Sequence, residues 1–224
     1  MAAQTPKGNM PVVVLKDDAS QVKGREAQKN NIAAAKIIAE IVHTSLGPKG
    51  MDKMLVDSLG DVTITNDGAT ILKEIDVQHP AAKMLVEISK TTDNEVGDGT
   101  TSAVVLAGAL LEHAEALVLQ DVHPTIIVDG YRKAGRKAKE FLDQIAENVS
   151  ATDNGVLLKI AKTSMQTKLV RKDSEQLADM IVKAVKAVAE NNGDKYTVDI
   201  DDIKVEKKAG GSIKDSKIIQ GIVL

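Results

Sequence analysis

The chain has 224 residues and is 43% apolar, which suffices for one large domain or two small ones with a packed core. Its formal net charge of -3 argues against a nucleic-acid or acidic-membrane partner. Cysteine is absent, which excludes disulfides, thiolate metal sites and cysteine nucleophiles. The aromatic content of 1% argues against stacking platforms for bases or sugars. We recognise no secretory signal and expect no membrane-spanning stretch, so the sequence favours a cytoplasmic protein.

The first part of the chain is predicted to be mainly helical with one small β-hairpin. An apolar run at 11–15 suits a strand, and apolar residues at helical spacing predict a helix over 25–45. Short β-type runs at 53–56 and 61–65 predict the hairpin, and the turn sequence Asn66-Asp67-Gly68 follows it.

Three longer helices are expected next. Proline is well suited to the first position of a helix, so helices are predicted to begin at Pro80 and Pro124. A helix beginning near Gly99 is apolar almost all round, and we expect it to be central and buried. The four histidines show no metal-site spacing and are interpreted as helix-surface or cap residues.

A domain boundary is predicted at 148–155, where small polar residues and glycine interrupt the helical pattern. Helical residues then follow from about 157, and a second helix over 177–188 ends at Asn191-Asn192-Gly193. Beyond Gly193 the apolar residues alternate, which predicts that the tail, including the last residues 218–224, forms β-strands.

The sequence Gly-Asp-Gly-Thr-Thr-Ser at 97–102 directly precedes the apolar helix pattern and indicates a phosphate site with its metal. Glycine leaves backbone N–H groups accessible, and the first turn of a helix offers unpaired donors and partial positive charge. The hydroxyls of Thr100, Thr101 and Ser102 add donors, while the carboxylate of Asp98 suits Mg²⁺. The alternative is an ordinary helix N-cap, which needs only one such residue.

Two further glycine turns, Gly47-Pro48-Lys49-Gly50 and Asn66-Asp67-Gly68, would complete such a site. Each alone is a weak signal, because both are routine turn sequences. Together they would add backbone donors and Asp67, a second carboxylate able to orient water. The chain lacks the P-loop and the dinucleotide-binding glycine signatures, so a nucleotide site here would be of another design.

Residues 46–54, 63–72 and 97–101 resemble the three nucleotide-binding signatures of group II chaperonins, the family of the archaeal thermosome and the eukaryotic cytosolic chaperonin. Residues 21–53 and 76–85 fit the same family, the archaeal branch most closely, and the resemblance extends from about residue 10 to residue 224.

The resemblance implies an ATP-hydrolysing, ring-forming chaperone subunit that binds ATP/ADP and Mg²⁺, other chaperonin subunits and unfolded client proteins. It implies that Asp98 ligates Mg²⁺ and that Asp67 helps to place the attacking water. It further implies that the nucleotide is contacted by residues of two of the three turns and by a γ-phosphate-sensing lysine: Gly47, Pro48, Gly99, Thr100, Thr101, Ser102 and Lys168. Ser102 stands where the family often has threonine, which keeps a hydroxyl.

The fold implied is a mainly α equatorial domain with a small β-hairpin, followed by part of an α+β intermediate domain. The expected division is 1–150 for the equatorial ATP-binding part, 151–217 for the intermediate part and 218–224 for the start of an apical domain. Family members continue well beyond this length, so the chain is interpreted as an N-terminal portion that lacks a second catalytic aspartate and alone hydrolyses little ATP. Two rivals stay open: a non-catalytic interaction module with a vestigial nucleotide pocket, and a conventional phosphotransferase.

Overall fold

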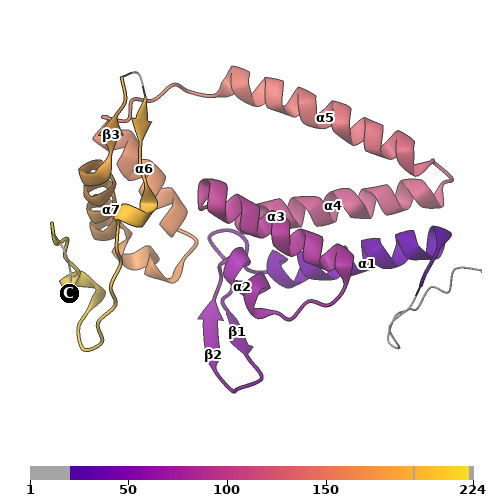
Figure 1. Cartoon of the computed structure of the whole chain (residues 1–224), viewed down its shortest axis with the longest axis horizontal. Coiled ribbons are helices and arrows are strands. Elements are labelled where there is room, and N and C mark those ends of the chain that lie inside the picture. The colour runs from indigo at the N-terminus through magenta and orange to yellow at the C-terminus, as the bar shows by residue number, and fades with distance from the viewer. Residues whose placement is uncertain (1–20, 194, 222–224) are drawn as a thin grey trace, which may run out of the picture.

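The computed structural model describes residues 21–193 and 195–221, so the strand expected at 11–15 lies outside the described residues. Seven α-helices occupy most of this part of the chain, together with two small antiparallel β-pairs. Figure 1 shows a larger helical unit and a smaller one at its end, joined by one extended segment. The α-helices are α1 (Gly24–His43), α2 (Gly68–Glu74), α3 (Pro80–Val96), α4 (Thr100–Leu119), α5 (Pro124–Ile145), α6 (Asn154–Met165) and α7 (Ser174–Val188).

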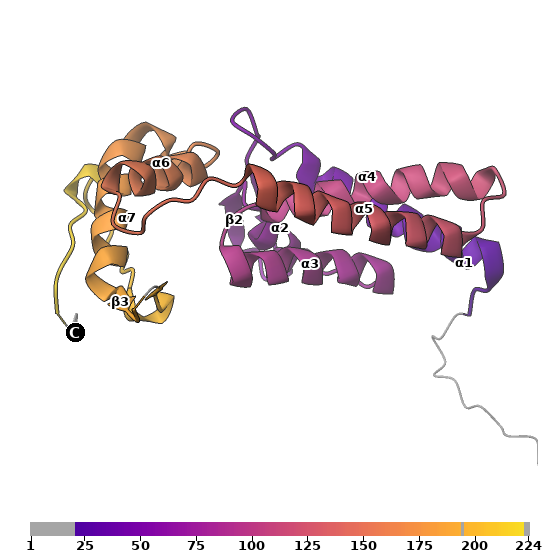
Figure 2. The same ribbon diagram turned by 90° about the horizontal axis from the view of Figure 1, so that it is seen from above.

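The first core lies between α1, α2, α3 and α4. Apolar side chains from these four helices form one buried cluster, and α4 packs on both α1 and α3. The helices α4 and α5 overlap in the view of Figure 2, whereas Figure 1 shows that they diverge from the turn that joins them. The buried members of the cluster are Ala35, Ile38, Ala39, Val42, Ile71, Leu72, Ala82, Leu85 and Val104.

Histidine and proline together begin two of the predicted helices. Pro80 and Pro124 occupy the first position of α3 and α5, as expected. The preceding residue caps the helix in each case: His79 Nδ1 accepts from Ala81 N at 3.2 Å, and His123 Nδ1 accepts from Thr125 N at 3.4 Å. These two histidines are therefore cap residues.

The β-hairpin is confirmed. Strands β1 (Lys53–Val56) and β2 (Val62–Thr65) are antiparallel, with Met54 opposite Ile64 and Val56 opposite Val62. In Figure 1 the hairpin projects away from the helices.

The helix α4 differs from expectation in two ways. It is buried along one stripe only, because Leu106 and Leu119 are 61% and 77% exposed. By length and composition it could also cross a membrane, contrary to the expectation that no stretch would be long enough. A helix at the centre of a soluble protein's core passes the same test, and α4 packs between α1 and α3.

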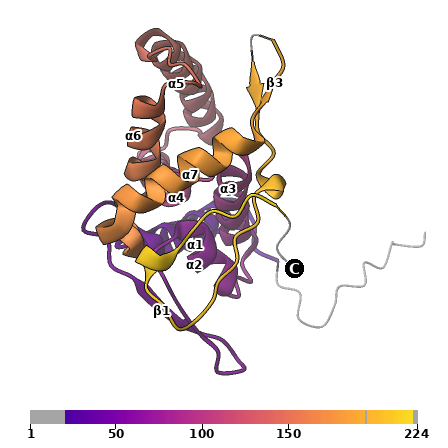
Figure 3. The same cartoon turned by 90° about the vertical axis from the view of Figure 1, so that its left-hand side faces the viewer.

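The smaller unit contains α6 and α7, whose contact buries Ala161, Met165, Ala178 and Val182. A 3₁₀ helix, Leu169–Asp173, joins them, and Figure 3 shows α7 crossing in front of the larger unit. The second core shares no buried residue with the first, and residues 146–153 between the units are exposed and outside the helices and strands. The expected domain limits at 150 and 217 stay predictions.

The predicted β-rich tail is wrong for most of its length. Among the described residues after α7, only Glu190–Asn191 (β3) and Tyr196–Thr197 (β4) pair as strands. Residues Ile200–Asp202 and Ile213–Asp215 are 3₁₀ turns, and 218–221 form no strand. Alternating apolar residues need a partner strand and a covered face, and within the described residues Ile200 and Val205 are 78% and 77% exposed.

Candidate functional site

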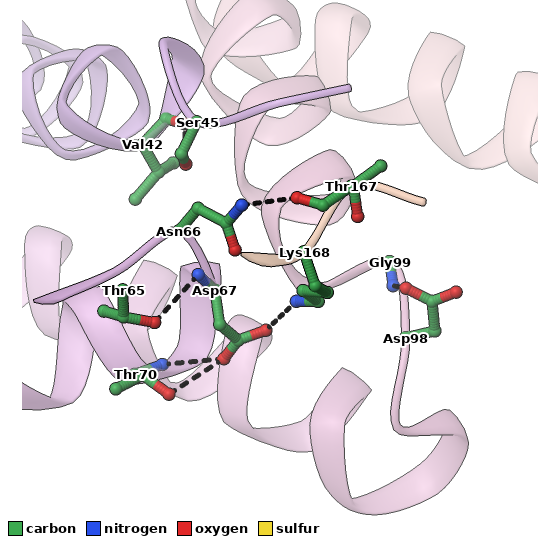
Figure 4. A network of polar contacts seen from close by, with 10 residues as sticks. All are labelled: Val42, Ser45, Thr65, Asn66, Asp67, Thr70, Asp98, Gly99, Thr167 and Lys168. Carbon is green, nitrogen blue, oxygen red and sulfur yellow. Dashed lines mark hydrogen bonds and ion pairs between the residues drawn. The ribbon is translucent and has the colours of Figure 1, made fainter. Parts of the chain in front are cut away.

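Asp67 is held in place by the start of α2, a helix that the sequence analysis had missed. It is the N-cap residue, and its Oδ2 accepts hydrogen bonds from the backbone N and the hydroxyl of Thr70, both at 3.0 Å. The Asp67 backbone N donates to Thr65 Oγ1 at 3.1 Å. An N-cap side chain that also receives a hydroxyl has little rotational freedom, so the other carboxylate oxygen points in a fixed direction (Figure 4).

The other carboxylate oxygen, Asp67 Oδ1, accepts a hydrogen bond from the Lys168 ammonium. The Lys168 ammonium lies 2.6 Å from Asp67 Oδ1, although the two residues are 101 positions apart in the sequence. The lysine comes from the smaller unit and the aspartate from the larger one, so this ion pair joins the two units. Their side chains are 35% and 27% exposed, which leaves the pair partly shielded from solvent.

The pKa of the Asp67 carboxyl is lowered from its ordinary value. Partial burial acts to raise it, but the hydrogen bonds from Lys168 and Thr70 and the charge of Lys168 together outweigh the burial. Asp67 is therefore an ionised acceptor at neutral pH.

The N-terminus of α4 meets the start of α2, at the residue after Asp67. Gly97 ends α3 and Gly99 precedes α4, with left-handed φ values of 73° and 79° that favour glycine. Gly99 offers no capping side chain, so the first N–H groups of α4 keep free donors. A methyl group on Gly68 would lie 2.5 Å from Thr101 Oγ1, so only a glycine at this position lets the starts of α2 and α4 meet.

Asp98 lies on the surface between the two glycines. Its Oδ1 accepts from Gly99 N at 2.8 Å, which orients the carboxylate near the start of α4. No group of three or more acidic or histidine side chains suited to a metal occurs within 21–193 and 195–221. One carboxylate still fits Mg²⁺, because this ion usually takes one or two carboxylates and completes its shell with water and phosphate oxygens.

The turn after α1 contains the third predicted glycine motif. Gly47 has a φ of 81°, and its carbonyl accepts from Gly50 N at 2.9 Å. The Pro48 carbonyl accepts from Arg171 Nη1 at 3.4 Å, so this turn, like Asp67, is contacted from the smaller unit.

The structure thus brings together some of the predicted residues. Asp67 contacts Lys168, and Thr101 lies against the residue after Asp67. Thr100 is buried, whereas Asp98 and Ser102 are exposed, and no hydrogen bond or ion pair in the described part of the chain joins either to Asp67 or Lys168. Two surface hollows, one beside α6 and α7 and one along α3, are lined by none of the predicted site residues.

Two supporting residues were not predicted. Thr70 fixes Asp67, and the Asn66 side-chain amide donates to the Thr167 carbonyl. The first had a weak sequence signal, because aspartate is a preferred N-cap residue and an N-cap side chain bonds to the residues of the first turn. The second had none, since Thr167 is 101 residues away.

A profile of the TCP-1/cpn60 chaperonin family matches residues 38–224. The chain belongs to this family. It is 58% identical over 214 residues to the thermosome subunit beta of Thermococcus kodakarensis, 57% to the thermosome subunit alpha of Archaeoglobus fulgidus and 56% to a thermosome subunit of Pyrococcus abyssi. Each alignment covers 96% of this chain and 39% of the relative. The chain therefore spans well under half the length of these curated relatives.

Membership of the chaperonin family confirms the resemblance inferred from the three glycine motifs. The mainly helical fold with a small hairpin, followed by a smaller helical unit, agrees with an equatorial domain and part of an intermediate domain. The individual roles of the site residues stay predictions.

Proposed function

We propose that the chain is part of an ATP-dependent chaperonin subunit that uses ATP binding and hydrolysis to drive conformational change around unfolded client proteins. Membership of the chaperonin family and the similarity to thermosome subunits support this proposal. The single observation that carries it is the Asp67–Lys168 ion pair, which joins the two units at the start of α2, where α2 meets the uncapped N-terminus of α4.

The phosphates of ATP or ADP would lie at the start of α4. The free N–H groups there, with Gly99 and the hydroxyls of Thr100, Thr101 and Ser102, form an anion site. Asp98 would hold Mg²⁺, which supplies neutralisation of charge on the phosphates. Gly47 and Pro48 would border the nucleotide from the turn after α1.

Asp67 and Lys168 have complementary tasks. A carboxylate with one oxygen fixed by Thr70 and a lowered pKa can accept a hydrogen bond from water through its other oxygen. Lys168 occupies that oxygen in the structure. A γ-phosphate offers the lysine a stronger anionic partner, so nucleotide binding would move the ammonium to the phosphate and free Asp67 for water.

The hairpin supports the proposal that the chain assembles with other chaperonin subunits. Met54, Val56, Val62 and Ile64 share one face of β1 and β2, and each is between 56% and 65% exposed. An exposed apolar face of this kind favours association with another protein. We propose a cytoplasmic protein without nucleic-acid or membrane partners, in agreement with the near-neutral charge.

The alternative is a non-catalytic interaction module that retains the turns without binding nucleotide. Calorimetric titration of the chain with ATP and Mg²⁺ separates the two. We expect binding that requires Mg²⁺, that is lost in Asp98→Ala, and that persists in the matched control Asp93→Ala, which removes an exposed carboxylate from α3. Absence of binding to the unsubstituted chain would favour the interaction module, and equal loss in both variants would exclude Asp98 as the metal ligand.

A further inference from the structure

Two consecutive residues of the larger unit hold two consecutive residues of the smaller one. The Asn66 side-chain amide donates to the Thr167 carbonyl, and Asp67 accepts from the Lys168 ammonium. Figure 4 shows these two contacts side by side, one to the backbone and one to the side chain of the same short segment. The Asn66 and Asp67 side chains are half-buried, so both contacts are partly protected from water.

Little else in the described chain fixes this segment against the larger unit. The two hydrophobic cores are separate, and the connection through 146–153 is an exposed segment outside the helices and strands. The Arg171 contact to the Pro48 carbonyl is at 3.4 Å between exposed groups and is correspondingly weak. The position of residue 167 relative to Asp67 therefore depends mainly on Asn66.

We propose that Asn66 is a positioning residue that fixes the backbone at Thr167 and thereby places the Lys168 ammonium on Asp67. When nucleotide is bound, the same Asn66 contact would keep the Lys168 ammonium within reach of the γ-phosphate. The second half of this proposal rests on the proposed nucleotide function. The first half concerns the nucleotide-free protein alone.

The physical reason is the flexibility of lysine. Its side chain has four rotatable bonds and loses much rotamer freedom when its ammonium is confined to one partner. A fixed Cα position limits the search to rotamers that reach Asp67. Without the Asn66 contact, the 167–168 backbone can withdraw, and the ammonium then pairs with Asp67 for a smaller fraction of the time.

The Asp67 carboxyl provides a direct measurement, because pairing with Lys168 helps to keep its pKa low. We would follow its titration by carboxyl-carbon NMR in the nucleotide-free chain. Lys168→Met gives the reference for complete loss of the pair, with a pKa raised toward the ordinary value. Asn66→Ala is expected to raise the pKa by a measurable part of that shift. Arg171→Ala, the matched control that also removes a contact between the units, is expected to leave it unchanged.

A second variant, Asn66→Ser, keeps a polar residue suited to a turn but is too short to reach the carbonyl, and it should behave like Asn66→Ala. If either folded Asn66 variant keeps the original pKa of Asp67, or if Arg171→Ala shifts it equally, the proposal is wrong. A merely structural Asn66 would lower stability without moving this pKa.

Nucleotide titrations test the second half. Lys168→Met should reduce the preference for ATP over ADP about tenfold or more, as expected for one lost charge-assisted hydrogen bond. Asn66→Ala should reduce it in the same direction by a smaller factor, and an unchanged preference would contradict the role toward the γ-phosphate. If the unsubstituted chain binds no nucleotide while the NMR shifts occur as expected, the proposed function fails and the positioning of Lys168 on Asp67 stands.

Discussion

Gly108 of α4 faces Ala39 of α1 so closely that a methyl group on Gly108 would lie 2.2 Å from Ala39 Cβ. Both residues are buried, and an alanine methyl cannot move without its backbone. We therefore expect Gly108→Ala to force the two helices apart and to destabilise the fold by about 1–3 kcal/mol, as overpacking does. Urea unfolding followed by circular dichroism measures this change.

The matched control is Gly135, which also lies inside a helix but has no atom within 4 Å of an added methyl group. Alanine is favoured over glycine in helices, so Gly135→Ala should stabilise α5 by up to about 1 kcal/mol. A shift of the same sign in both variants would mean that the contact between α1 and α4 is looser than the structure indicates.

Replacing Ser89 or Ser45 by alanine should change the unfolding free energy in opposite directions. Ser89 is 1% exposed, and its hydroxyl has no hydrogen-bond partner among the described residues. Ser45 is 3% exposed, and its hydroxyl donates to the Val42 carbonyl at 2.7 Å. Because an unpaired buried hydroxyl is costly whereas a paired one contributes, Ser89→Ala should raise the unfolding free energy by about 1 kcal/mol and Ser45→Ala should lower it by about 1 kcal/mol. Equal effects in chemical denaturation would indicate that the Ser89 hydroxyl finds a partner in solution.

The sequence predicted those helices whose start is marked by a strong local signal. Pro80 and Pro124 follow histidines, and both helices begin there. The helix α2 was missed because Asn66-Asp67-Gly68 is equally typical of a turn and of a helix cap, and the choice between them depends on the packing of Ile71 and Leu72 in the core. That packing involves three other helices and cannot be read locally.

In the candidate site, too, the sequence could not predict a contact that depends on tertiary packing. The resemblance implied separate roles for the two residues, with Asp67 placing the attacking water and Lys168 sensing the γ-phosphate. It could not reveal that the two side chains contact each other, because the contact depends on how the smaller unit lies against the larger one across 101 residues. For the same reason, the apolar residues of α4 predicted burial on all sides, whereas the described neighbours cover one stripe.

The apolar face of the hairpin predicts self-association. Ile64 lies opposite Met54 on this face, and both are more than half exposed. We expect Ile64→Glu to weaken association of the chain by tenfold or more, because burying one such side chain is worth about 1.5–3 kcal/mol. Sedimentation velocity over a range of concentrations measures the effect.

The control is Ile200→Glu, which places the same charge on an equally apolar side chain that is 78% exposed in the tail. It should leave association unchanged. Equal weakening by both variants would point to non-specific clustering. If the unsubstituted chain is monomeric at all concentrations, the hairpin face does not mediate self-association.

The lowered pKa of Asp67 predicts how the contact between the units depends on pH. A carboxyl whose pKa is lower in the folded than in the unfolded state contributes stability that is fully present above the unfolded value, which is near 3.8. That contribution is lost as the pH falls through the folded value, where protonation breaks the ion pair with Lys168.

We therefore expect Asp67→Asn to lower the unfolding free energy at neutral pH, and the difference from the unsubstituted chain to shrink below about pH 4. Urea unfolding of both proteins between neutral and acid pH measures this difference. The matched control is Asp129→Asn, because the exposed Asp129 carboxylate pairs, within the described part of the chain, only with Arg132 one turn along α5. A difference between Asp67→Asn and the unsubstituted chain that stays constant down to the most acid pH would show that Asp67 acts through its cap on α2 alone and that its charge contributes nothing to holding the smaller unit.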